Sequence, residues 1–190
     1  MKRYLLGDIC KVYSGVDLKD SDYRKSGIPV LKSSEVSGGF ISEDVVFYCN
    51  PEKALNGNLV RFGDVVITRM GGKCRVGINL TNVDYLPIST IFKLDPNPEI
   101  VSREYLYYCL LNSLQEINSH IANGNVSKLY KSSLLKVALS IPDLETQARI
   151  VEYLNQLQEL RKELELRKRQ GVYYRSKIMN NLKECASTRK

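Results

Sequence analysis

The chain has 190 residues, 43% of them hydrophobic and 26% charged, which is enough for one compact domain and a helical appendage. No apolar run approaches the roughly 20 residues that a membrane-spanning helix needs, so we expect no membrane partner and a cytoplasmic location. The formal net charge of +7 does not by itself indicate that the globular part binds nucleic acid, because residues 1–143 hold 17 Lys and Arg against 15 Asp and Glu, and residues 144–190 hold 11 against 6.

Cysteine and histidine usage argues against metal and disulfide chemistry. The five cysteines are an odd number, and no pair has a two-residue spacing: Cys10, Cys49, Cys74, Cys109 and Cys185. This pattern favours reduced, mostly buried thiols over a disulfide framework or a zinc site. His120 is the only imidazole in the chain, so we expect no metal site and no Ser/His/Asp or Cys/His catalytic set. No cofactor-binding glycine fingerprint follows a strand and no Asn/Asp-Pro-Pro-Tyr motif occurs, so we expect no cofactor and no catalytic residues.

The first predicted strand that is followed by candidate binding residues covers residues 28–32. Ser33, Ser34 and Glu35 follow at its end, and Gly38-Gly39 then turns the chain. A weak strand is expected at 45–48 and one helical turn at 51–55. Loops at strand ends often carry binding residues, so the two serines are candidates.

The clearest strand signal lies at 60–69, where Val65, Val66 and Ile67 form a β-branched run. The next segment, 70–77, is a glycine-rich loop that holds Lys73 and Arg75 and opens onto a strand near 78–80. It lacks the Gly-x₄-Gly-Lys-Ser/Thr pattern of a nucleotide-binding loop. Two alternatives stay open: a loop through which backbone and cations approach a nucleic acid, or a plain hairpin.

The following segments alternate between strand and helix. We expect a strand at 86–94, a helix at 102–121 that begins at a capping serine, Ser102, and a last strand at 134–139. Tyr105, Tyr107 and Tyr108 are interpreted as core packing rather than base stacking. Residues 123–125 end the helix, and a polar, basic stretch follows. Several short strands around one helix predict an α+β fold with a mainly β core.

A long helix is predicted after Pro142 and Asp143, which end the last strand and offer a cap. Its apolar residues recur at steps of three and four and form one stripe: Ile150, Tyr153, Leu154, Leu157, Leu160 and Leu164. Two heptads fit a coiled-coil seam, and the third fails at Arg167 and Gly171. The stripe predicts a partner helix, and packing on its own domain is the alternative.

Five motifs in this order resemble the successive signatures of type I restriction-modification DNA specificity subunits. They are YLLGDICKVYSG, IPVLKSSEV, FGDVVITRMGG, EYLYYCLLNS and LSIPDLETQARIVEYL, and the resemblance extends from Tyr4 to about Leu182. It implies a mainly β target recognition domain, expected at residues 1–142, and a helical, coiled-coil-like dimerisation and spacer arm at 143–190. Full-length members carry two such units, so this chain resembles a half-length subunit.

The resemblance also implies a function and partners. We expect the chain to bind double-stranded DNA, to form a homodimer through the stripe, and to dock methyltransferase subunits and, with them, restriction subunits, where the catalysis would lie. The candidate DNA contacts are loop residues with cationic or hydrogen-bonding side chains: Ser33, Ser34, Arg69, Lys73, Arg75, Asn125, Ser127, Lys128 and Lys131. The alternative is a regulatory protein that sequesters methyltransferase subunits without reading DNA.

Overall fold

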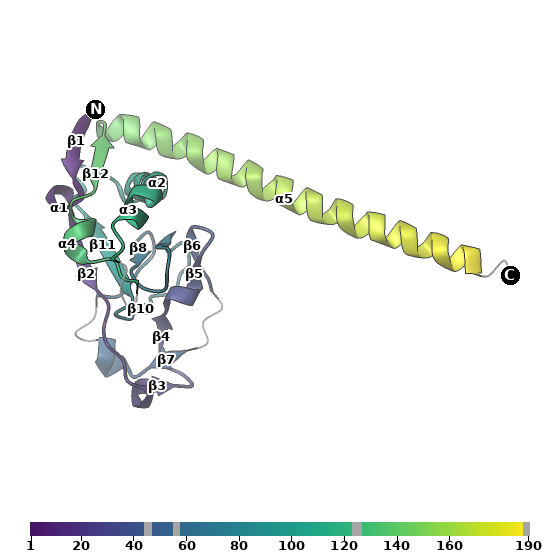
Figure 1. Ribbon diagram of the computed structural model, residues 1–190, viewed down its shortest axis with the longest axis horizontal. Coiled ribbons are helices and arrows are strands. Elements are labelled where there is room, and N and C mark those ends of the chain that lie inside the picture. The colour runs from purple at the N-terminus through teal and green to yellow at the C-terminus, as the bar shows by residue number, and fades with distance from the viewer. Residues whose placement is uncertain (44–46, 55–57, 123–126, 188–190) are drawn as a thin grey trace. The chain divides into compact units, whose positions relative to one another are not determined.

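The computed structural model describes residues 1–43, 47–54, 58–122 and 127–187, with side chains up to residue 179 (Figure 1). The chain divides into two units, Met1–Ala148 and Arg149–Lys190. Among the described residues, the first unit holds every strand and all helices except most of the last one. The predicted α+β class, a sheet-rich domain followed by a long helix, is confirmed.

The largest sheet has six strands in the order β2-β11-β8-β9-β6-β5. These strands are β2 (Cys10–Ser14), β11 (Ile91–Pro96), β8 (Val65–Thr68), β9 (Val76–Ile78), β6 (Phe40–Ile41) and β5 (Val36–Ser37). β8 is the predicted β-branched run, and all four of its residues are buried. Its burial on both faces explains why its sequence shows no alternation of polar and apolar residues.

Two smaller sheets complete the first unit. One has the order β10-β4-β7-β3 and is built from β10 (Leu86–Pro87), β4 (Ile28–Leu31), β7 (Tyr48–Cys49) and β3 (Tyr23–Arg24). The other pairs β1 (Lys2–Leu5) antiparallel with β12 (Ala138–Ile141). The β1–β12 pair therefore brings the start of the chain beside the last strand before the long helix.

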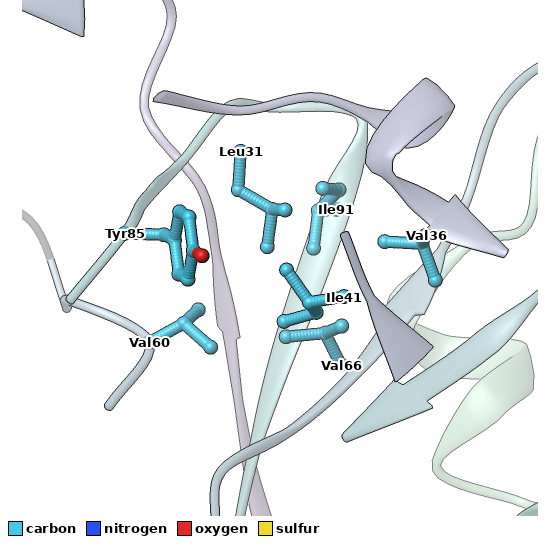
Figure 2. Close-up of a cluster of buried hydrophobic side chains, with 7 residues drawn as sticks. All are labelled: Leu31, Val36, Ile41, Val60, Val66, Tyr85 and Ile91. Carbon is cyan, nitrogen blue, oxygen red and sulfur yellow. The ribbon is translucent and has the colours of Figure 1, made fainter. Parts of the chain in front are cut away.

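A hydrophobic cluster joins the six-stranded and four-stranded sheets (Figure 2). Its members come from β4, β5, β6, β8, β11 and the turns around them: Leu31, Val36, Ile41, Val60, Val66, Tyr85 and Ile91. Because neighbouring strand residues point to opposite faces, Val65 and Ile67 face away from this cluster. The helix α2 (Arg103–Asn112) packs on β8, β9 and β11.

The helices of the first unit are short. α1 is Leu6–Ile9, α2 is followed by α3 (Leu114–Ser119), and α4 is Lys131–Leu134; the single turns η1, η2 and η3 are Asp20–Asp22, Ser33–Glu35 and Pro51–Ala54. Ser102 caps α2 as predicted, since its hydroxyl accepts a bond from the Tyr105 amide at 3.2 Å. Tyr105 and Tyr107 are buried, which confirms their packing role, and Tyr108 is half-buried.

Several element boundaries were wrong: the strand expected at 60–69 is the shorter β8, and the one expected near 78–80 is β9, which begins at Val76 and ends at Ile78. The predicted helix 102–121 is interrupted at Ser113, the C-cap of α2 and the N-cap of α3. The predicted strand 86–94 is two strands, because the chain turns at residues 88–90, where the Ile91 amide donates to the Ile88 carbonyl at 2.9 Å. The predicted strand 134–139 begins in α4, and β12 extends to Ile141. Of the weak strand at 45–48, residues 45 and 46 lie outside the described residues.

The long helix α5 is Leu144–Ser187 and continues through Gly171. Asp143 caps it, because Oδ1 accepts from the Thr146 amide at 2.9 Å, and this bond holds the pKa of Asp143 below its ordinary value. Gln147 is fully buried in the first unit. Its amide accepts from the Ser102 N–H and donates to the carbonyls of Ile100 and Pro142, at 2.8 to 3.0 Å.

We expect two of the thiols to be unreactive in the folded protein. Burial raises the pKa of Cys10 to about 12 and that of Cys74 to about 11. The thiolate is the nucleophile, so at pH 8 both groups are almost wholly in the inert thiol form. Mass spectrometry after brief iodoacetamide treatment should show both unmodified in the native protein and modified in denaturant. Equal labelling in both conditions would contradict their burial.

Candidate nucleic-acid interface

Four segments that are distant in the sequence meet at one end of the two larger sheets. They are η2, the loop between β8 and β9, the turn before β11, and residues 127–129. The Ser33 hydroxyl donates to Thr90 Oγ1 at 3.0 Å, and the Arg69 amide donates to the Thr90 carbonyl at 2.9 Å. The Leu129 amide then donates to the Arg69 carbonyl at 2.8 Å. The candidate residues of three separate predicted loops thus form one surface.

The β8–β9 loop is the connection of an antiparallel hairpin, in which Ile67 is paired with Val76. Gly71 and Gly72 have φ values of 96° and 94°, which L side chains rarely adopt, and open space surrounds both. The glycines therefore serve the turn rather than close packing. The loop is thus the turn of a hairpin, and the nucleic-acid role of its tip remains a prediction.

Both cations of this loop are exposed, and Arg75 is bonded to η2. The Arg75 guanidinium donates from Nη2 to the Ser33 carbonyl at 2.6 Å. The Arg75 amide donates to Thr68 Oγ1 at 2.9 Å. Between the two cations, the Cys74 amide donates to Asn118 Oδ1 at 2.7 Å, which fastens the loop to α3.

Arg69 does not project freely. Its Cζ lies 4.8 Å from the centroid of the Phe92 ring, a cation–π arrangement. Its Nε is buried and has no hydrogen-bond partner in the described part of the chain. Since the side chain is half-buried against an aromatic ring, it contributes packing whatever else it contacts.

The remaining candidates lie around this surface. Ser34 is exposed and donates to Glu35 Oε1 at 2.8 Å. Lys128, half-buried, lies 5.7 Å from the ring centroid of Tyr130, and Lys131 is exposed as the first residue of α4. Ser127 is half-buried, and Asn125 lies outside the described residues.

Sequence reasoning missed Thr90 and Lys32. Thr90 links η2 to the Arg69 backbone, but it lies inside what was predicted as one continuous strand. The Lys32 ammonium lies 3.1 Å from the ring centroid of Phe47 and 4.4 Å from that of Tyr23. A lysine directly before two serines was the available signal for Lys32. Cations and hydroxyls in this arrangement suit phosphate oxygens and base edges.

In the second unit, the predicted stripe of α5 is exposed at most positions. Tyr153, Leu157, Leu160 and Leu164 are 52% to 64% exposed, while Ile150 and Leu154 are half-buried. The seven-residue spacing fails at Arg167 and Gly171 and resumes in the same register at Tyr174 and Ile178. Among the described residues, no helix is long and apolar enough to cross a membrane, and no group of three potential metal ligands occurs.

The sequence of the chain is similar to those of known specificity proteins. The sequence model of the family described as "Type I restriction modification DNA specificity domain" matches residues 1–174. The chain is also similar to the putative type I restriction enzyme specificity subunit S.HindORF215P of Haemophilus influenzae, with 29% identity over 126 residues, 62% of this chain and 32% of that protein. The chain therefore spans about a third of the length of this curated relative.

Solved structures share the fold. The HsdS subunit from Thermoanaerobacter tengcongensis gives a TM-score of 0.64 at 23% identity, covering 84% of this chain and 37% of that chain. A chain from work on complex assembly and conformational transition of the type I R-M system gives 0.66 at 22%, covering 86% and 39%. The type I S subunit from M. genitalium gives 0.61 at 13%, covering 83% and 39%.

Proposed function

The chain belongs to the type I restriction-modification DNA specificity family, and from this membership we propose that it is a half-length specificity subunit that reads one half of a split DNA site. Its first unit would bind double-stranded DNA through the surface formed by η2, the β8–β9 loop and residues 127–131. The convergence of these loops at Thr90 is the observation that carries the proposal. A set of cations and hydroxyls on one surface can hold phosphates and leave side chains facing the bases.

We further propose that two copies pair through α5. The exposed stripe of Tyr153, Leu157, Leu160 and Leu164 is apolar surface that a second helix would remove from water. With 44 residues at about 1.5 Å each, α5 is about 66 Å long, more than the roughly 34 Å of one DNA turn. Two paired helices of this length can carry two reading surfaces on separate turns of one duplex.

The charge along the helix favours an antiparallel pair. Residues 149–166 hold three basic and four acidic side chains, whereas residues 167–179 hold five basic side chains and no acidic one. A parallel pair would place two strongly basic segments side by side. An antiparallel pair sets each basic segment against a slightly acidic one, which lowers the repulsion.

The methyltransferase subunits would dock on this two-headed reader, with restriction subunits joining them, and would supply the catalysis. We expect the chain with its methyltransferase subunit to enrich one sequence motif from a random duplex pool. Replacing Lys73, Lys128 and Lys131 together by alanine should abolish that enrichment at moderate salt, because phosphate contacts supply much of the affinity. Sequencing of the bound fraction is the measurement.

One outcome would instead support a regulatory role. Residues 1–143 carry nearly balanced charge, so a protein that captures methyltransferase subunits without reading DNA is the competing function. It would bind the methyltransferase subunit in a pull-down and enrich no sequence even at low salt. That pair of results would refute the DNA-reading function.

A further inference from the structure

We propose that Arg75 is a positioning residue that holds η2 and the β8–β9 loop at a fixed separation, while Lys73 contacts a DNA phosphate. The inference rests on the proposed function, since it takes these loops as the DNA-facing ones. It divides two cations of one loop, which sequence alone treats as equivalent, into a structural role and a binding role.

The contacts of Arg75 carry the first step. Its guanidinium donates from Nη2 to the Ser33 carbonyl at 2.6 Å, a bond in which the donor is charged. Such bonds are shorter and about twice as strong as those between neutral groups. The Arg75 backbone is fixed too, because its amide donates to Thr68 Oγ1 at 2.9 Å and its carbonyl accepts from the Thr68 amide at 2.9 Å. Because both its backbone and its guanidinium are bonded, Arg75 can hold η2 and the β8–β9 loop at a fixed separation.

The turn that Arg75 contacts is held from a second direction. Ser33 Oγ donates to Thr90 Oγ1 at 3.0 Å. Within the turn, Glu35 is almost fully buried, and its Oε2 accepts from the Lys32 amide at 2.7 Å. Because η2 follows β4 of the four-stranded sheet while Arg75 and Thr90 precede β9 and β11 of the six-stranded sheet, these bonds link the two sheets at the candidate interface.

Lys73 offers the contrast. It lies two residues before Arg75, is exposed, and makes no hydrogen bond or ion pair in the part of the chain that the structure describes. Gly71 and Gly72 precede it in open space. Its ammonium is therefore free to turn toward a phosphate. Arg75 is also exposed, but its bond from Nη2 to the Ser33 carbonyl fixes the orientation of the guanidinium.

The test compares two variants that lose the same charge, Arg75→Met and Lys73→Met. Affinity for the selected duplex is measured over a series of salt concentrations, with the methyltransferase subunit present. The logarithm of the association constant falls linearly with the logarithm of the salt concentration, and each phosphate contact adds about 0.9 to the steepness of that fall. We expect Lys73→Met to make the fall shallower by about one, without changing the selected motif. Arg75→Met should keep the slope and relax the base preference.

A measurement without DNA separates this inference from the proposed function. In the free protein, Arg75→Met should speed hydrogen exchange of the amides around Ser33 about tenfold, since a charged hydrogen bond is lost, and Lys73→Met should leave it unchanged. Thr90→Val removes the 3.0 Å bond from Ser33 Oγ to Thr90 Oγ1 at constant charge and leaves only the longer 3.4 Å contact with the Thr90 carbonyl. It should therefore also speed exchange around Ser33 and keep the steepness of the salt dependence. The positioning role would be overturned if Arg75→Met made the salt dependence shallower by about one and left hydrogen exchange around Ser33 unchanged. If the wild type selected no sequence, only the proposed DNA-reading function would fail. The hydrogen-exchange result would still decide whether Arg75 holds the two loops together.

Discussion

Replacing Leu157 and Leu160 together by aspartate should convert the protein from a pair to single chains. If each leucine contributes at least about 1.5 kcal/mol when buried, removing four of them from a symmetric pair weakens association by at least about 10⁴-fold. The introduced carboxylates add a desolvation cost to any seam that still forms. Sedimentation velocity should show the mass of one 21.6 kDa chain where the wild type shows two.

A matched control carries the same added charge on the other side of the helix. Asn155→Asp with Ser176→Asp introduces two carboxylates far from the stripe, given 3.6 residues per turn, and should leave the pair intact. Both variants should keep the helical circular dichroism of the wild type. The pairing proposal fails if Leu157→Asp with Leu160→Asp leaves the mass unchanged, or if the wild type is a single chain at high concentration.

The elements that sequence reasoning placed well are those whose signal is local. The β-branched run of β8, the Ser102 cap of α2 and the Asp143 cap of α5 each depend on residues within a few positions of one another. The turn inside the predicted strand at 86–94 depends on contacts with distant segments, since the Ser89 amide donates to the Val16 carbonyl at 2.8 Å. Periodicity cannot report such a contact, so that boundary was missed.

The candidate interface shows the same difference between local signals and contacts of distant segments. The sequence predicts both Ser33 and Arg75 as DNA contacts, because each lies in a loop after a predicted strand. Their mutual bond spans 42 positions and depends on the strand order, which the sequence does not reveal. Likewise, Arg69 is a candidate DNA contact by sequence, and only the fold places it over Phe92. Residue type predicted where binding groups lie, and the fold decides which of them are already engaged.

Asp64→Ala should strongly destabilise the first unit, although Asp64 belongs to a turn and not to a strand. Its carboxylate is almost fully buried, with Lys93 Nζ at 2.6 Å, Arg103 Nη1 at 3.3 Å and the Arg61 amide at 2.9 Å. Removing it leaves Lys93, itself only 15% exposed, as a buried charge without its counterion. Breaking a buried pair in this way costs about 3–5 kcal/mol. Urea denaturation, followed by circular dichroism, measures the loss.

The neighbouring carboxylate provides the control that distinguishes burial from charge. Asp84 lies 3.7 Å from Arg61 Nε, but both side chains are more than half exposed, so Asp84→Ala removes the same charge at a cost of less than about 1 kcal/mol. Similar losses in the two variants would show that burial of Asp64 is not what matters. Because Asp64 directly precedes β8, whose far end leads into the Arg69–Arg75 loop, a large loss for Asp64→Ala alone would mean that part of the FGDVVITR motif stabilises the scaffold beneath the interface.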